Sequence, residues 1–133
     1  LIFIIFLKYL SKIRLFLLKL LVLQSYKMVK KLNKIGVLTS GGDSPGMNAA
    51  IRSVVRTCAF HKVECIGIYR GYEGMIEGDF KILNARSVNY IINKGGTFLK
   101  SARSEEFRTK IGREKAYQRL SKEGIQALIL IGG

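Results

Sequence analysis

A glycine-rich turn between an apolar strand and an amphipathic helix constrains the fold more than any other feature of the sequence. Residues 34–39 (KIGVLT) form a short apolar run, typical of a strand that is buried on both faces. The turn follows at residues 40–46 (SGGDSPG), and a helical pattern then extends from Met47 to about Phe60. Its apolar residues recur three and four positions apart, which predicts one buried helix face: Ala50, Ile51, Val54, Val55 and Cys58.

Apolar runs and helical patterns keep alternating along the rest of the chain. After the first helix we expect a strand, a glycine-punctuated loop, a short helix, a longer helix and a last strand, at residues 63–69, 71–74, 87–93, 112–122 and 127–131. The two later helices are expected to end at Gly95–Gly96 and at Gly124. This order predicts an α/β protein with three layers, α/β/α, and a mostly parallel, Rossmann-like sheet that is incomplete in this chain.

The chain is strongly basic, and its excess of positive charge begins in the first 27 residues. Lys and Arg number 23 against 9 Asp and Glu, a net charge of +14, and the first acid is Asp43. Residues 1–27 are apolar and basic, but their cations recur too often for a membrane span and are not ordered as in a signal peptide. Two interpretations stay open: a basic amphipathic helix at a membrane surface, or an extension ahead of a true start at Met28, which we favour.

We therefore expect the chain to have two parts. Residues 1–27 are expected to be a basic, apolar extension outside the fold, and residues 28–133 the N-terminal part of a nucleotide-binding domain. The chain stops where an apolar strand runs into Gly132 and Gly133, a place where α/β proteins carry a ligand loop. That ending predicts a domain truncated at its C-terminal end.

Cysteine and histidine give no pattern typical of metal ligands or redox chemistry. Cys58 and Cys65 are too few and too far apart for a zinc site or a redox CxxC motif, and they lie in apolar segments, so buried reduced thiols are expected. His61, the only histidine, is expected to be a cation at a helix end. No metal ligand is predicted in this chain.

The turn at residues 40–46 is a candidate phosphate-binding site. Glycines let the main chain approach a ligand closely and point N–H groups at phosphate oxygens, and the next helix adds the N–H groups of its first turn. The spacing of Gly41 and Gly46 is that of a Walker A loop, but Met47 and Asn48 replace its Lys and Ser or Thr. Taken alone, the turn is also compatible with a tight connection that binds nothing.

Three arginines are further candidates for phosphate binding. Arg52 and Arg56 lie four positions apart on the first helix, so they can hold a phosphate between them or simply face solvent. Arg103 follows a glycine pair in a segment without helical periodicity, which suits a loop residue that reaches into a cleft.

Five segments, in order, resemble the bacterial ATP-dependent 6-phosphofructokinases. They are KIGVLTSGGDSPGMNAAIR (34–52), GIYRGYEG (67–74), GGTFLKSAR (95–103), EFR (106–108) and GIQALILIGG (124–133). The resemblance extends over residues 33–133 without an obvious gap, and several motifs in order are far more specific than any one of them. Residues 1–27 have no counterpart in it.

The resemblance implies a reaction for the full-length protein. In that reaction the γ-phosphoryl group of ATP is transferred, with Mg²⁺, to the 1-hydroxyl group of fructose 6-phosphate, the committed step of glycolysis. The resemblance also implies a cytoplasmic homotetramer that ADP or GDP activates and phosphoenolpyruvate inhibits. No nucleic-acid or membrane partner is implied.

The same resemblance implies roles for individual residues. Gly42 is implied to lie against the ATP phosphates, and Arg103 to assist at the transferred phosphate. Further ATP-binding positions complete the set: Ser104, Gly133 at the start of the next nucleotide loop and, as neighbours of the adenosine, Tyr72, Phe107 and Arg108.

The family's allosteric effector site matches two segments of this sequence. The first lies on the first helix and makes phosphate binding the favoured interpretation of that helix face: Arg52, Ser53, Val54, Val55 and Arg56. The second falls before the glycine pair: Ala85, Arg86, Ser87, Val88, Asn89 and Tyr90. Tyr90 stands where the family commonly has Asp, a departure that removes a carboxylate from the effector site.

The residues that perform the family's chemistry would follow Gly133. They include the Mg²⁺-site aspartate and the catalytic base, so we expect no catalytic residue in this chain and no phosphofructokinase activity of its own. A pyrophosphate-dependent phosphofructokinase is the alternative, because the residue that discriminates the two donors would also follow Gly133. A non-enzymatic basic module that binds nucleic acid or an anionic membrane is a remote alternative from another class.

Overall fold

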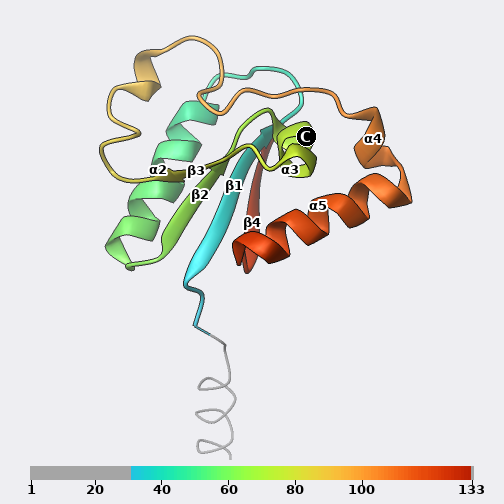
Figure 1. Cartoon of the computed structure of the whole chain (residues 1–133). Coiled ribbons are helices and arrows are strands. Elements are labelled where there is room, and N and C mark those ends of the chain that lie inside the picture. Colours follow the sequence, from blue (N-terminus) through green and yellow to red (C-terminus); the bar gives the residue numbers. More distant parts are fainter. Residues whose placement is uncertain (1–30, 133) are drawn as a thin grey trace, which may run out of the picture. The chain divides into compact units, whose positions relative to one another are not determined.

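A four-stranded sheet with helices on both faces forms the body of the protein (Figure 1). The computed structural model describes residues 31–132, and the residues from Leu32 onward belong to one compact unit. The extension predicted over residues 1–27 and the predicted ATP-binding position Gly133 lie outside the described residues.

The sheet is mostly parallel, as predicted, and its strand order is β3-β2-β1-β4. Strand β1 (Lys34–Ser40) pairs in parallel with β2 (Glu64–Ile68) on one side and with β4 (Ala127–Gly132) on the other. Strand β3 (Phe80–Leu83) pairs antiparallel with β2 and was not predicted. It has only four residues, and two of them, Lys81 and Ile82, are exposed, so the sequence carries no buried apolar run there.

Two apolar clusters, one on each face of the sheet, confirm the three-layer arrangement. On one face, α2 (Met47–Phe60) packs its buried residues Ile51, Val55 and Cys58 against the strands, together with the segment before η1 (Ile91–Asn93). On the other face, α3 (Gly71–Glu77) and α5 (Lys110–Glu123) cover the strands: the cluster there is Leu38, Ile68, Met75, Ile76 and Ala116. The predicted apolar face of the first helix is therefore confirmed.

The segment predicted as a glycine-punctuated loop at residues 71–74 is instead the first half of α3, so this prediction was wrong. The two glycines, Gly71 and Gly74, made this segment look like a loop in the sequence. In the structure it is helical, and Met75 and Ile76 are buried. Gly74 is required by packing, because a Cβ there would lie 1.7 Å from the main-chain oxygen of Tyr69.

The short helix predicted over residues 87–93 is reduced to the three residues of η1. Tyr90, directly before η1, has a left-handed main chain (φ 61°), and the residues that precede it form turns, so the helix begins only at Ile91. The helix predicted over residues 112–122 is confirmed as α5, which Gly124 ends in the left-handed conformation. A short helix, α4 (Glu105–Arg108), precedes it and was not predicted.

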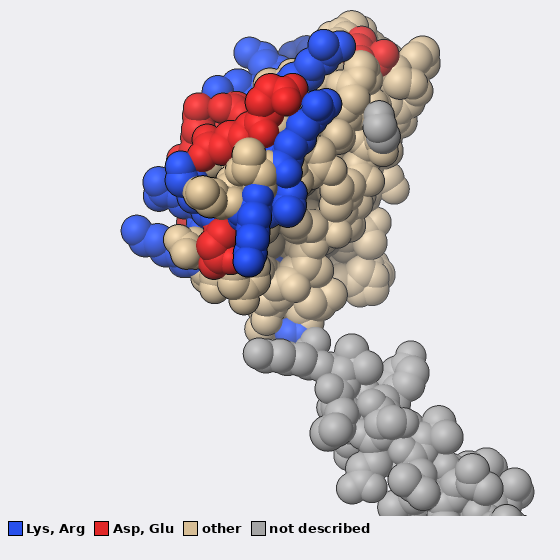
Figure 2. Space-filling model, turned by 90° about the vertical axis from the view of Figure 1, so that its right-hand side faces the viewer, with Lys and Arg blue, Asp and Glu red and all other residues tan. Residues whose placement is uncertain are grey.

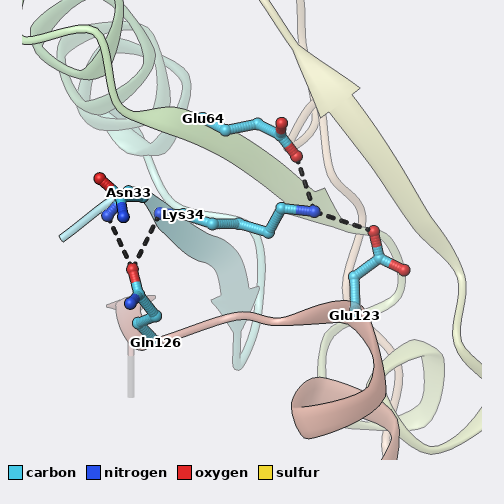
Figure 3. A network of polar contacts seen from close by, with 5 residues as sticks. All are labelled: Asn33, Lys34, Glu64, Glu123 and Gln126. Carbon is cyan, nitrogen blue, oxygen red and sulfur yellow. Dashed lines mark hydrogen bonds and ion pairs between the residues drawn. The ribbon is translucent and has the colours of Figure 1, made fainter.

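A polar network connects the amino end of β1 to β2, to α5 and to Gln126, the residue before β4 (Figure 3). The Lys34 ammonium contacts carboxylates of Glu64 at 2.8 Å and Glu123 at 3.4 Å. The hydrogen bond to Glu64 is the main cause that raises the pKa of Lys34. The Gln126 side-chain oxygen accepts from the main-chain N–H groups of Asn33 (2.7 Å) and Lys34 (3.2 Å). The amino end of β1 is thus held in place by contacts with neighbouring elements of the protein.

The two cysteines are buried free thiols, as predicted. They lie in the cluster under α2, and burial raises the pKa of Cys58 and raises that of Cys65 to about 12. None of the helices within residues 31–132 has the length and apolar content needed to cross a bilayer.

Charged side chains of both signs gather on one part of the face drawn in Figure 2, beside a broad area without any. Ion pairs join the two signs on α4 and α5, between Lys115 and Glu106 at 2.6 Å and between Arg108 and Glu105 at 3.4 Å. Nucleic-acid-binding surfaces are typically stripes of one sign, so this mixed surface does not favour the basic-module alternative.

Candidate functional site

The carboxyl ends of β1 and β4 meet at one edge of the sheet, where Ser40 and Gly132 are register partners. Gly132 has φ +104°, and a Cβ there would lie 2.2 Å from the main-chain oxygen of Ser40. The chain enters the glycine-rich turn directly after Ser40. Parallel α/β proteins bind ligands outside such strand ends, so this edge is the candidate site.

The turn exposes main-chain groups at the start of α2. Gly41 (φ 81°) and Gly46 (φ 95°) adopt left-handed conformations that favour glycine, and no side chain caps the helix at Gly46. A pocket of about 310 Å³ lies beside the turn, between residues 43–49 and residues 92–96. A helix end without a side-chain cap leaves N–H groups for water or for an anion.

Gly42 differs from the other glycines of the turn. Its φ is not in the left-handed region, and a Cβ at this position would meet nothing within 4 Å. Neither main-chain conformation nor internal packing therefore requires glycine here. The open space beside Gly42 fits a ligand that approaches the main chain closely.

Segment 97–104 lies against the turn and carries Arg103. Its exposed hydroxyl group at Ser101 donates to the main-chain oxygen of Gly41 at 2.7 Å. Arg103 is exposed in an irregular loop, as predicted, and makes no ion pair with any residue in the range 31–132. Ser104 begins α4, and its side-chain oxygen accepts from the Phe107 N–H at 3.2 Å.

Buried polar side chains that the sequence did not single out hold this segment in place. The Thr39 hydroxyl, fully buried, donates to the Lys100 carbonyl at 2.7 Å and accepts from the Thr97 hydroxyl at 3.1 Å. The Asn48 amide donates to the carbonyls of Lys94 (3.2 Å) and Gly96 (2.8 Å) and accepts from the Phe98 N–H at 2.7 Å. The position of Asn48 next to Met47 on the buried helix face was the available sequence clue.

The two aromatic residues expected near the adenosine lie face to face. The rings of Tyr72, on α3, and Phe107, on α4, stack with centroids 4.3 Å apart and planes 17° apart. Arg108 ends the same short helix α4, where it is exposed. The structure therefore brings Tyr72 and Phe107 together from segments 35 residues apart in the sequence.

The two segments expected at an effector site also lie side by side. Val88 and Ile91 pack into the same cluster as Ile51 and Val55 of α2. Val55 and Val88 are fully buried core residues, so their side chains are not available to a ligand. Solvent reaches the other positions to different degrees, Arg52, Val54 and Ser87 being half-buried and Ser53, Arg56, Ala85, Arg86, Asn89 and Tyr90 exposed.

The described residues do not supply a ligand set for a metal ion. Across residues 31–132 there is no group of three or more His, Cys, Asp or Glu side chains placed to hold one. Asp43 is the only acid in the turn. The chemistry available at this edge is therefore that of main-chain N–H groups, hydroxyl groups and the Arg103 guanidinium, which suits an anionic ligand.

Comparisons with known proteins agree on one family. A family model described as phosphofructokinase matches residues 34–133. An ATP-dependent 6-phosphofructokinase of Halothermothrix orenii is 60% identical over 102 residues, which are 77% of this chain and 31% of that protein. The corresponding protein of Halalkalibacterium halodurans is 56% identical over 102 residues, 32% of its length. The chain thus spans about a third of the curated relatives it matches.

Solved structures give the same result for the fold. Phosphofructokinase from Saccharomyces cerevisiae matches with a TM-score of 0.73 and 45% sequence identity, over 76% of this chain and 14% of that one. Phosphofructokinase of Pichia pastoris in the T-state matches with a TM-score of 0.73 and 40% identity, over 78% of this chain and 11% of that one. The sheet and its helices are therefore those of a known α/β architecture.

Proposed function

This chain belongs to the phosphofructokinase family, and on that basis we propose that its complete protein transfers the γ-phosphoryl group of ATP to fructose 6-phosphate. The product of this transfer is fructose 1,6-bisphosphate, in the committed step of glycolysis. The relatives named above carry the name ATP-dependent 6-phosphofructokinase, which favours ATP over pyrophosphate as the donor.

One observation supports the nucleotide site most directly. Gly42 has open space where a Cβ would be, next to a helix start without a side-chain cap and a loop that carries Arg103. In phosphoryl transfer the protein mainly positions the reactants and neutralises charge. A main chain that can approach a phosphate, together with a guanidinium nearby, performs both tasks.

Each residue of the proposed nucleotide site has a separate role. Gly42 lies against the phosphates of ATP, and Arg103 neutralises charge that develops on the transferred group. Ser104 adjoins Arg103 and fixes the start of α4. The adenosine borders the stacked rings of Tyr72 and Phe107, with Arg108 and Gly133 as further contacts.

Mg²⁺ is proposed to accompany the nucleotide and to neutralise charge on its phosphates. Residues 31 to 132 hold no group of three or more His, Cys, Asp or Glu side chains that could bind this ion. We propose no catalytic role for any residue of this chain beyond the assistance of Arg103, and we expect the 133-residue chain by itself to show no turnover.

The remaining assignments concern regulation and assembly. We propose that residues 52–56 and residues 85–90 contribute to an effector site for ADP or GDP and phosphoenolpyruvate in a cytoplasmic homotetramer. Two segments packed against one another at the outer side of α2 support this grouping. The arginines Arg52 and Arg56 supply the charge for a phosphate there, without the carboxylate that Tyr90 replaces.

A coupled assay on the complete protein tests the proposed reaction. With fructose 6-phosphate, ATP is expected to support turnover and pyrophosphate is not. An Arg103→Ala variant should lower kcat by about 10²–10³-fold, the usual cost of removing one transition-state donor. Arg119→Ala, at an exposed position of α5, is the matched control. Turnover with pyrophosphate alone would establish the alternative, and turnover by the 133-residue chain would contradict the assignment of chemistry to other parts of the protein.

A further inference from the structure

Three buried or half-buried side chains connect β1 and α2 to the segment that leads to Arg103. Thr39, Asn48 and Thr97, with the main-chain groups they bond between residues 94 and 100, are called here the polar latch. Thr39 has no exposed surface and Asn48 is 8% exposed. Buried hydrogen bonds of this kind specify one arrangement, because each partner left unpaired would be costly.

The polar latch holds a strained residue. Lys100 has a left-handed main chain with φ 60°, which is unfavourable for a residue with a Cβ. Its carbonyl accepts the Thr39 hydroxyl at 2.7 Å, and its N–H donates to the Thr97 carbonyl at 3.0 Å. The surrounding hydrogen bonds therefore keep Lys100 in a conformation that it would not adopt in a free loop.

Lys100 stands between a fixed point and the candidate phosphate site. The preceding residue, Leu99, is fully buried, and its carbonyl accepts the Arg70 N–H at 2.9 Å. The next residue, Ser101, bonds to the Gly41 carbonyl, and Arg103 follows two positions later. The main-chain direction at Lys100 consequently sets the direction in which the chain leaves the core towards Ser101 and Arg103.

We propose that the polar latch is a positioning device, in which the left-handed Lys100 presets the Arg103 loop against the Gly42 turn before a nucleoside triphosphate binds. The inference rests on the nucleotide site proposed above. Strained residues held by their surroundings are concentrated at binding sites, where they reduce the reorganisation that binding requires.

Lys62 gives a matched control for Lys100. It is also an exposed lysine with a left-handed main chain, φ 56°, but it lies after the end of α2, and its N–H bonds to the Ala59 carbonyl. Lys100→Gly and Lys62→Gly therefore make the same chemical change and release the same kind of strain. Only Lys100→Gly acts next to Arg103.

Lys100→Asn separates conformation from charge. Asn tolerates the left-handed region better than most residues, so this variant loses the ammonium but keeps the local preference. Lys100→Gly loses both the ammonium and the restriction of the main chain. The difference in amide exchange and ATP affinity between the two variants measures the effect of the fixed main-chain conformation at Lys100 on each.

Two readouts on the complete protein test the proposal. The first is amide hydrogen exchange at Ser101, Ala102 and Arg103 without ligand, and the second is the affinity for ATP measured by calorimetry. We expect Lys100→Gly to exchange faster there and to bind ATP about two- to fivefold more weakly than Lys100→Asn, a size typical of main-chain restriction. Lys62→Gly should match the unmodified chain in both readouts.

The outcomes separate this inference from the proposed function. If Lys100→Gly and Lys100→Asn behave alike in both readouts, the latch does not position Arg103 and the inference is overturned. If the unmodified complete protein binds no ATP, the nucleotide site proposed above fails. In that case the exchange readout decides whether the latch presets the loop: faster exchange only in Lys100→Gly supports it, and equal exchange in all variants overturns it.

Discussion

The carboxyl edge of the sheet and the outer face of α2 are both proposed to bind phosphate groups, but their polar side chains are held very differently. At the sheet edge, Thr39 and Asn48 are buried and bonded to the segment that carries Arg103. On the outer face of α2, Arg52 and Arg56 make no hydrogen bond or ion pair with any residue in the range 31–132. The first region has its geometry before any ligand arrives.

This difference affects how much conformational entropy each region would lose when it binds a ligand. Main-chain donors that buried hydrogen bonds hold in place need little reorganisation, whereas long exposed arginine side chains, Arg103 included, lose rotamer freedom when a ligand fixes them. In the proposed effector site, position 90 also carries Tyr in place of the carboxylate that we expected there. We therefore expect phosphate binding to be organised by this chain at the sheet edge and to depend on further groups at the outer face of α2.

The largest expected effect comes from a glycine at the sheet edge. Gly71 has φ +59°, and a Cβ there would lie 2.8 Å from the main-chain oxygen of Thr39. Gly71→Ala should lower the free energy of unfolding by about 2–4 kcal/mol, because both strain and overpacking oppose it. Gly95→Ala is the control, since its Cβ would meet nothing within 4 Å, and it should stay within about 0.5 kcal/mol. Urea unfolding followed by circular dichroism measures both, and equal effects would show that the edge is not the more constrained region.

Alkaline pH tests whether the two regions share one core. The pKa of Cys65 is raised to about 12 by burial, so its contribution to stability is complete below the unfolded pKa near 9 and is lost as pH rises towards 12. The raised pKa of Lys34 acts in the same direction. The free energy of unfolding should fall by about 1.4 kcal/mol per pH unit in this window.

Urea titrations between pH 8 and pH 11 measure this dependence, and Cys65→Ala is the control in which the slope should shrink. A single transition at every pH is expected, because α2 belongs to both regions. If the outer face of α2 unfolded at a pH where the sheet edge stayed folded, the two regions would unfold independently. That result would contradict a shared core.

Gly42→Ala should affect binding without affecting stability. The fold leaves room for a methyl group at this position, and its φ does not require glycine. We expect an unfolding free energy within about 0.5 kcal/mol of the unmodified chain. ATP affinity should fall about tenfold, or 1.4 kcal/mol, because the methyl group would occupy the space left for the phosphates. Calorimetric titration measures the affinity, and unchanged binding would remove Gly42 from the site.

The smallest expected effect is on the outer face of α2. Arg52→Ala and Arg56→Ala should each change the unfolding free energy by less than about 0.5 kcal/mol, because these exposed or half-buried side chains form no ion pair within residues 31–132. Thermal unfolding checks this expectation. A loss of more than about 1 kcal/mol in unfolding free energy for either variant would mean that contacts within the chain hold these arginines in place. The contrast between the sheet edge and the outer face of α2 would then be wrong.

The order of the main elements could be predicted from the sequence because it depends on local apolar periodicity. The strands β1, β2 and β4 and the helices α2 and α5 were found in this way. The helix α3 was missed because its packing requires glycine at 74, and glycine in a sequence indicates a loop. The antiparallel β3 was missed because it is short and half-exposed.

The candidate site could be predicted only where a residue type points to its chemistry. Gly42 and Arg103 meet that condition, and the structure places them on neighbouring segments. Thr39, Asn48 and Thr97 do not, because a threonine in a buried strand or an asparagine in a helix gives no indication of a partner 46 to 61 residues away. Long-range hydrogen bonds depend on the assembled fold, which local sequence patterns do not contain.

An ATP titration followed by nuclear magnetic resonance tests most directly whether the sheet edge is the preorganised phosphate site of this chain. Amide resonances of residues 41–44, 46 and 101–104 are predicted to shift together as ATP is added, while those of residues 52–56 shift far less. Shifts confined to residues 52–56 and 85–90, with residues 41–46 unchanged, would contradict the account.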